Sequence, residues 1–262
     1  MTDPVLLTRE GAVARLTLNR PEAGNAIGPA MASALRAAAI VCAEDPGIRC
    51  VVLCARGRVF CVGGDIGAFS SQLESLGALT RALTADLHAA MAIFARMEKP
   101  LITVVNGPAA GAGFSLALAG DLVLAGQSAV FAPAYGGIGL SPDGGASWLL
   151  PRLVGLRRAQ EMLLLGLRVN AAQALAEGMV TRLCPDETLQ AEADELAVRV
   201  ARGAVRAWGR TRALLLESFA ATLPAQLDAE ARAIAQSGHD AEAREGIAAF
   251  LAKRKPDFPA GG

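Results

Sequence analysis

The sequence predicts an α/β fold, and three observations support that prediction. Short apolar runs alternate with helical patterns through the first half of the chain. Hydrophobic residues make up 53% of the 262 residues, which is enough to build a large core. After Asp143 the pattern becomes almost wholly helical, so a helical region is expected to follow the α/β body.

Local signals place the elements of the first half. The predicted strands are residues 13–18, 50–54, 101–105, 122–124 and 129–131. A proline in the first turn opens a predicted helix over residues 29–43. A longer helix is predicted over about residues 73–97, because Lys99-Pro100 ends it before the next strand.

The second half carries Ala/Leu faces opposite Arg/Glu faces. The helices predicted there are residues 171–177, 187–202, 205–219, 223–236 and 241–253. Their apolar faces favour use as an interface between subunits, and the alternative is a solvated bundle.

Composition argues against several classes of partner. Lys+Arg and Asp+Glu balance at 25 each, which leaves no basic surface for a nucleic acid. Residues 101–120 are uncharged over the roughly 20 residues that span a bilayer, but Asn106-Gly107-Pro108 and Gly111-Ala112-Gly113 interrupt them. Charged residues near the N-terminus are atypical of a signal peptide. We therefore expect a cytoplasmic protein without a membrane partner.

Cysteine and histidine offer little catalytic material. The five cysteines form an odd set without a CxxC pair, so we expect buried, inert thiols rather than a disulfide framework or a metal site. The two histidines, His88 and His239, are far apart in the sequence. His88 falls in the predicted helix 73–97, where we expect a solvated or core-capping role rather than catalysis.

Two glycine-rich segments follow predicted strands, namely Val62-Gly63-Gly64-Asp65 and Gly111-Ala112-Gly113. In such turns backbone N–H groups point outward without an intrahelical partner. One loop can hold a phosphate, whereas two that converge can form an oxyanion hole. A dinucleotide fingerprint is disfavoured because Leu116 stands at its third glycine position. Purely structural tight turns are the alternative.

The whole pattern resembles the enoyl-CoA hydratase/isomerase (crotonase) family, and most closely its members that lack both hydratase glutamates. The matching segments are LNRPEAGNAI (18–27), FCVGGDIGAF (60–69), VNGPAAGAGFSLALAGDLVLA (105–125), FAPAYGGIGLSPDGG (131–145), GLRRAQEMLLLGLRVNAAQALAEGMVTRLCP (155–185) and AFLAKRKPDF (249–258). The resemblance implies an α/β spiral of ββα turns over residues 1–195 that binds acyl-CoA. Residues 196–262 would form a C-terminal helical oligomerisation region, which implies a homotrimer or a hexamer.

The resemblance also implies an acyl-CoA thioester as substrate, with no cofactor besides the coenzyme A that the substrate carries. Gly64 and Ala112 match the two main-chain donors that clasp the thioester oxygen, and Ala112 replaces the usual glycine. The other positions implied to bind substrate are Arg20, Ala23, Gly63, Asp65, Ile66, Gly111, Ser115, Tyr135 and Lys255. The family often has a cation at the position of Gly24, and Arg20, Lys253 and Lys255 are candidates to replace it.

The resemblance places the family's two hydratase glutamates at Ser115 and Tyr135, and neither residue is a carboxylate base. One acid remains at Asp143, eight residues beyond Tyr135. Its position resembles the catalytic aspartate of dienoyl-CoA isomerases, ring-modifying isomerases of the phenylacetate pathway and aryl-CoA dehalogenases. Dehalogenation is less favoured, because it also uses a histidine near the site and neither His88 nor His239 matches.

The sequence therefore predicts an isomerase that moves a double bond in an enoyl-CoA, with Asp143 as general acid/base. For Asp143 itself, the alternative is a cap on the following helix. For the protein, the alternatives are a hydratase that uses Asp143 and an ordered water, and a non-catalytic acyl-CoA-binding protein.

Overall fold

The computed structural model describes residues 3–258, and its main sheet has six strands in the order β1-β2-β3-β4-β6-β9. The strands are β1 (Val5–Glu10), β2 (Val13–Leu18), β3 (Cys50–Ala55), β4 (Leu101–Val105), β6 (Leu122–Gly126) and β9 (Arg182–Cys184). The pair β1–β2 is antiparallel, and every later neighbour pairs in parallel. Parallel neighbours require crossover connections, and helices provide them.

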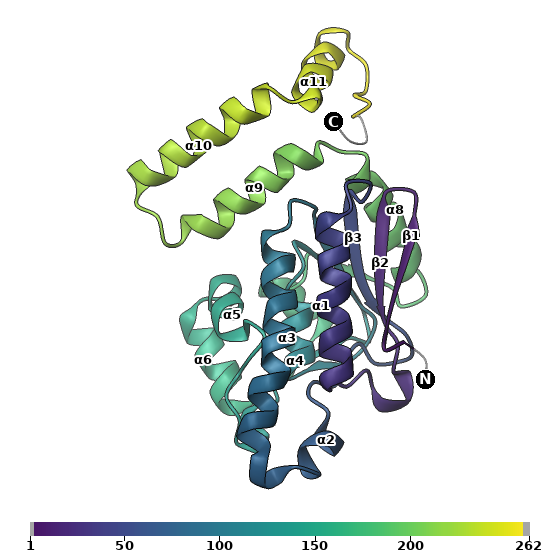
Figure 1. Ribbon diagram of the computed structural model, residues 1–262, viewed down its shortest axis with the longest axis vertical. Helices are drawn as coiled ribbons and strands as arrows, with labels where there is room; N and C mark the ends of the chain where they lie inside the picture. The colour runs from purple at the N-terminus through teal and green to yellow at the C-terminus, as the bar shows by residue number, and fades with distance from the viewer. Residues whose placement is uncertain (1–2, 259–262) are drawn as a thin grey trace.

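Helices cover both faces of this sheet. On one face α1 (Pro29–Glu44) and α3 (Leu76–Arg96) lie side by side (Figure 1). On the other face α8 (Leu189–Ala201) packs against a separate apolar cluster. Strand β3 serves both layers, since Val51 and Leu53 join the first core while Val52 joins the second. Burial on both faces explains why the central strands are continuous apolar runs.

A second, three-stranded sheet brings the glycine-rich segments together. It consists of β5 (Ala109–Ala110), β7 (Val130–Ala132) and β8 (Val169–Asn170), with β7 between the other two. Isolated bridges join Ile27 to Gly64 and Cys61 to Ala109. The loop after β3 is thereby held against the loop after β4.

Short helices complete the body. They are η1 (Pro21–Ala23), α2 (Ile66–Ser70), η2 (Leu73–Ser75), α4 (Ala112–Ala117), η3 (Gly136–Ile138), α5 (Ala146–Val154), α6 (Leu156–Leu165) and α7 (Ala171–Ala176). Residues 101–120 therefore form strands and a short helix, as their turn signals predicted. No helix within residues 3–258 is long and apolar enough to cross a membrane.

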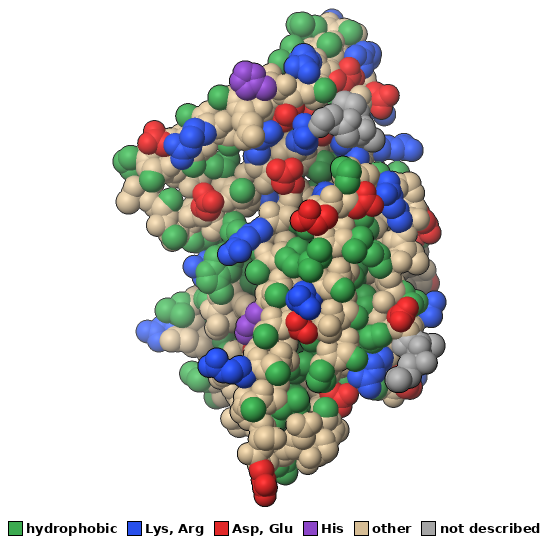
Figure 2. Space-filling model, in the orientation of Figure 1, with side chains coloured by type: hydrophobic (Ala, Val, Ile, Leu, Met, Phe, Trp, Pro, Cys, Tyr) green, Lys and Arg blue, Asp and Glu red, His purple; other side chains and the backbone are tan. Residues whose placement is uncertain are grey.

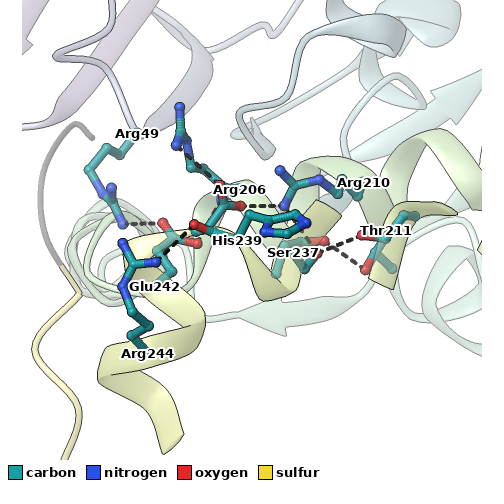
Figure 3. A network of polar contacts seen from close by, with 11 residues as sticks. Arg49, Arg206, Arg210, Thr211, Ser237, His239, Glu242 and Arg244 are labelled. Carbon is teal, nitrogen blue, oxygen red and sulfur yellow. Dashed lines mark hydrogen bonds and ion pairs between the residues drawn. The ribbon is translucent and has the colours of Figure 1, made fainter. Parts of the chain in front are cut away.

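The C-terminal helices are α9 (Val205–Ser218), α10 (Leu223–Gly238) and α11 (Ala241–Leu251). The α9–α10 hairpin projects from the body, and α11 lies at the end of the molecule opposite α2 (Figure 1). A buried ion pair joins α11 to the body, because Arg49 Nη2 lies 3.2 Å from Glu242 Oε1 (Figure 3). Arg49 also donates to the carbonyl oxygens of Ala201 and Gly203, both at 2.7 Å.

The structure confirms the predicted α/β class and most of the predicted elements, and it corrects two points. The N-terminal strand β1 was not predicted, because it is an edge strand with mostly exposed residues. The segment after Asp143 is not wholly helical, since it also contains β8 and β9. These two strands have only two and three residues, too few to show a period of two. The division between residues 195 and 196 stays a prediction, and it falls inside α8.

All five cysteines are buried free thiols, as their apolar neighbours indicated. Burial raises the pKa of the Cys42, Cys50 and Cys61 thiols to about 12. At neutral pH these three side chains are therefore uncharged core residues rather than nucleophiles.

Candidate active site

A cavity of about 680 Å³ lies between the two glycine-rich loops, the face of α3 and the turn that precedes α5. Its lining residues are Val62, Gly64, Ile66, Phe69, Gly77, Thr80, Arg81, Leu83, Thr84, Ala85, His88, Gly111, Ala112, Ala134, Tyr135, Ile138, Leu140, Ser141 and Asp143. Most of these side chains are apolar, and the polar ones gather on α3 and around Asp143. This composition is typical of a small-molecule site.

The two glycine-rich loops touch through their main chains. Gly63 has φ +100°, and a Cβ on this residue would lie 2.8 Å from the Ala110 carbonyl oxygen and 3.3 Å from the Ala112 nitrogen. The Gly63 carbonyl oxygen accepts a 2.7 Å hydrogen bond from the Ile27 N–H. Only a residue without a side chain allows this approach, which explains the glycine in the sequence.

Two backbone N–H groups are available at this junction. Gly64 and Ala112 both line the cavity, and within residues 3–258 neither N–H donates a backbone hydrogen bond. Ala112 is the first residue of α4, so its N–H has no partner within the helix. Ala112 does not have a positive φ. Its backbone therefore accommodates the side chain of an alanine at a position where the family usually has glycine. The pair can therefore serve as oxyanion donors.

Asp143 supplies the carboxylate of the cavity. Tyr135 donates a 2.7 Å hydrogen bond from its hydroxyl to Asp143 Oδ1. Ser115 Oγ donates to the Asp143 carbonyl oxygen at 2.8 Å and lies 2.7 Å from the Tyr135 hydroxyl. Within residues 3–258 no hydrogen bond involves Asp143 Oδ2, so this oxygen is available for chemistry.

Asp143 does not cap the following helix with its side chain. Helix α5 begins at Ala146 with Gly145 as its N-cap, and no side-chain cap bond is present. The Ala146 N–H instead donates to the Asp143 backbone carbonyl at 3.1 Å. The helix-cap alternative for the carboxylate is therefore wrong.

Tyr135 acts as a neutral hydrogen-bond donor in this arrangement. Burial raises the pKa of its phenol, and the adjacent Asp143 carboxylate raises it further. Tyr135 therefore has no role as a base near neutral pH, as its residue type indicated.

His88 is the residue that sequence reasoning missed. It lines the cavity, and its Nε2 accepts a 3.0 Å hydrogen bond from the Gly144 N–H. The His88 side chain is exposed, as the expected solvated role requires, but it also lines the cavity next to Asp143, which the sequence did not predict. Its spacing held a signal, because Thr80, Thr84 and His88 recur every fourth residue on one helix face.

Arg20 and Asp65 pair with each other beside the site. Arg20 Nη1 lies 3.1 Å from Asp65 Oδ2 and donates to the Ala26 carbonyl at 3.2 Å. Asp65 also caps α2 by accepting from the Ala68 N–H at 3.2 Å. Partial burial alone would raise the pKa of Asp65, but the Ala68 and Arg20 hydrogen bonds outweigh it and hold that pKa below its usual value. This pair orders the first glycine-rich loop.

Only some of the catalytic and substrate-binding residues that the family resemblance implies line the cavity. The members that line it are Gly64, Ile66, Gly111, Ala112, Tyr135 and Asp143. Gly63 and Ser115 lie directly behind the wall, in contact with residues of the lining. Ala23 lies in η1 outside the cavity. The exposed Lys255 follows α11, the helix at the end of the molecule opposite α2 (Figure 1).

Within residues 3–258 no group of three or more His, Cys, Asp or Glu side chains could hold a metal ion. The cavity itself places the Asp143 carboxylate next to the main-chain groups of Gly64 and Ala112, an arrangement that can support proton transfer.

Comparison with known proteins agrees with this geometry. The family model described as "Enoyl-CoA hydratase/isomerase" matches residues 8–261. The chain belongs to the enoyl-CoA hydratase/isomerase family. Its crotonase fold is shared with the crystal structure of an enoyl-CoA hydratase from Polaromonas sp. JS666, which is 36% identical with a TM-score of 0.93. That match covers 97% of this chain and 99% of the other.

Relatives in this family carry both kinds of name. The chain is 38% identical to the 1,2-epoxyphenylacetyl-CoA isomerase of Escherichia coli K12, over 98% of this chain and 99% of the relative. It is 39% identical to a probable enoyl-CoA hydratase of Rhodobacter capsulatus, over 94% of each. The family is an enzyme family that acts on acyl-CoA thioesters, and these names do not choose between isomerase and hydratase.

Proposed function

We propose that this family member is an isomerase that moves a double bond in an enoyl-CoA, with Asp143 as general acid/base. One observation carries the proposal: Asp143 is the only carboxylate among the described residues that line the cavity, and it shares that cavity with the Gly64 and Ala112 N–H groups. The CoA carried by the substrate is the only coenzyme this chemistry requires. The cytoplasmic location of the protein stays a prediction.

The proposed reaction moves one proton in two steps. The Asp143 carboxylate removes a proton from the carbon α to the thioester of a 3-enoyl-CoA, and the electron pair moves onto the carbonyl oxygen. The Gly64 and Ala112 N–H groups stabilise the resulting dienolate. The protonated Asp143 then returns the proton at the γ carbon, which leaves the double bond conjugated with the thioester.

Two side chains favour isomerisation over hydration. Hydration requires a water held between acid/base groups, usually two carboxylates. Ser115 and Tyr135 stand at the expected carboxylate positions, and both bond to Asp143 instead. Because the high pKa of Tyr135 keeps its phenol protonated, only one group of this set can accept a proton from substrate.

The first test is Asp143→Asn, which keeps the shape of the side chain but removes its basicity. We expect kcat for a 3-enoyl-CoA to fall by about 10²- to 10⁴-fold, while the Kd for a non-reactive acyl-CoA stays near the wild-type value. Glu74→Gln is the matched control, because Glu74 is exposed and outside the lining. Full activity in Asp143→Asn would contradict the proposed role.

A substrate panel separates the alternatives. The panel contains 2-enoyl-CoA, 3-enoyl-CoA, an aryl-epoxide thioester suggested by the E. coli relative, and a haloaryl thioester. The last is included because His88 lies at the site after all. Formation of 3-hydroxyacyl-CoA faster than double-bond migration would favour the hydratase, and binding without any conversion would favour a non-catalytic protein.

A further inference from the structure

His88 is a polar cavity residue that the proposed proton transfer does not use. It lies on α3, and its Nε2 accepts a hydrogen bond from the N–H of Gly144, the residue that follows Asp143. The donor–acceptor distance is 3.0 Å, which is a normal hydrogen bond.

The turn that carries Asp143 has an unusual backbone. Gly144 has φ +58° and Gly145 has φ +88°, so two consecutive residues occupy the left-handed region. A Cβ on Gly144 would lie 2.9 Å from the Cβ of Ser115. This conformation is restricted to glycine and needs fixed contacts around it to persist.

Three side chains from separate parts of the chain hold the turn. Ser115 of α4 donates to the Asp143 carbonyl, and Tyr135 donates to the Asp143 carboxylate. His88 of α3 accepts from the Gly144 N–H on the other side of the same peptide segment. Among these three contacts, the one with His88 has a ring nitrogen, Nε2, as its acceptor, and a protonated ring nitrogen cannot accept a hydrogen bond.

His88 Nε2 can accept this hydrogen bond only when the imidazole ring is neutral. When Nε2 accepts a hydrogen bond, the ring proton is on Nδ1, and a protonated ring has two donors and no acceptor. Histidine is also the side chain whose charge ordinarily changes between about pH 5 and pH 8. Protonation of His88 would therefore break its contact with Gly144.

We propose that His88 is a positioning residue: its neutral ring holds the Asp143–Gly144 turn in the catalytic geometry, and its protonation releases that turn. This rests on the proposed function of Asp143. The charged and titratable groups that share the cavity with His88 are Asp143 and Tyr135 from the facing segments and Arg81 from α3 itself. Asp86, also on α3, is paired with Arg36 of α1 at 2.7 Å.

The test compares two substitutions. His88→Leu removes the acceptor, and we expect kcat at about pH 8 to fall roughly tenfold with KM little changed. His88→Gln keeps an acceptor oxygen that does not titrate, so it should restore most of kcat. Its acid limb in the profile of kcat against pH should lie at lower pH than that of the wild type.

His239→Gln is the matched control, because His239 is exposed on the C-terminal helices, and its profile should match the wild type. Wild-type kcat in His88→Leu would overturn the proposal. So would an acid limb in His88→Gln that coincides with that of the wild type.

A second measurement does not depend on turnover. Amide hydrogen exchange of the peptide containing Gly144 should be faster in His88→Leu than in the wild type. At the same pH the exchange of this peptide in His88→Gln should stay close to that in the wild type. Equal exchange in all variants would overturn the positioning role even if Asp143→Asn behaves as expected. Loss of activity in Asp143→Asn tests the proposed function separately.

Discussion

Tyr135 shows how one residue sets the geometry of the candidate site. Its hydroxyl bonds to Asp143 Oδ1 and lies next to Ser115 Oγ. Tyr135→Phe removes this donor without changing the ring, so the carboxylate loses a fixed orientation. We expect kcat to fall about tenfold and the free energy of unfolding to fall by about 1 kcal/mol. Steady-state kinetics and urea unfolding measure the two effects, and an unchanged kcat would show that Tyr135 does not orient Asp143.

The substitution Gly63→Ala tests the contact between the two glycine-rich loops. Alanine at this position would place a Cβ 2.8 Å from the Ala110 carbonyl oxygen, which forces the loops apart. We expect Gly63→Ala to lose most of kcat, by about 10²-fold or more, because the proposed oxyanion donors Gly64 and Ala112 would separate. Gly11→Ala is the control: Gly11 also has positive φ, but its Cβ would meet nothing within 4 Å. Equal losses in both variants would assign the effect to backbone strain alone.

The sequence predicted single residues of the site better than their contacts. The glycine-rich loops were singled out by their residue type and their place after predicted strands, and Asp143 was singled out by the family resemblance. The contacts of Asp143 with Ser115 and of Gly144 with His88 join residues 28 and 56 positions apart. No local pattern reports such a separation, since it depends on how α3 and α4 pack in the folded chain.

At the scale of elements, burial decided which predictions succeeded. Strands β3 and β4 were predictable because helices cover both faces of the sheet, so nearly all their residues are apolar. Strand β1 lies at the sheet edge and exposes most of its residues, which removes the alternation that marks a strand. Strands β8 and β9 pair through the backbone of a few residues and carry almost no sequence signal.

The Lys99 side chain caps the C-terminal end of α1. Its Nζ donates to the carbonyl oxygens of Cys42 and Asp45 at 2.9 and 3.1 Å, and it also contacts the Ala43 carbonyl oxygen. These carbonyls belong to the last turn of α1, where a cation is favourable. We expect Lys99→Met to lower the free energy of unfolding by about 1–3 kcal/mol. Urea unfolding measures this loss, and the exposed Lys253→Met should change stability much less.

At the scale of the whole molecule, the C-terminal helices expose much apolar surface. Hydrophobic side chains are visible along the projecting α9–α10 hairpin (Figure 2). The large hydrophobic side chains that are more than half exposed there are Leu215, Phe219, Leu223, Leu227, Ile234, Ile247, Phe250 and Leu251. Surface of this kind favours contact with another subunit, in line with the homotrimer or hexamer that the family resemblance implies. The number of subunits stays a prediction.

A buried ion pair holds these helices to the body. Figure 3 shows Arg49 and Glu242 directed toward one another, and their side chains are only 8% and 5% exposed. Glu242 Oε2 also accepts from the Arg206 N–H at 3.1 Å, so this carboxylate connects α11, α9 and the start of β3. This carboxylate therefore helps to place α11 against the body.

Glu242→Gln tests that connection, because it removes the carboxylate that pairs with the buried Arg49 guanidinium and accepts from the Arg206 N–H. We expect the free energy of unfolding to fall by about 3–5 kcal/mol, since removing one charged member of a buried ion pair is costly. Glu245→Gln is the matched control: Glu245 pairs with Arg254 at the surface, where screening by water keeps such pairs weak. Urea unfolding of both variants, together with amide exchange across α11, measures the difference. Equal stability of the two variants would show that the buried pair does not hold the C-terminal helices.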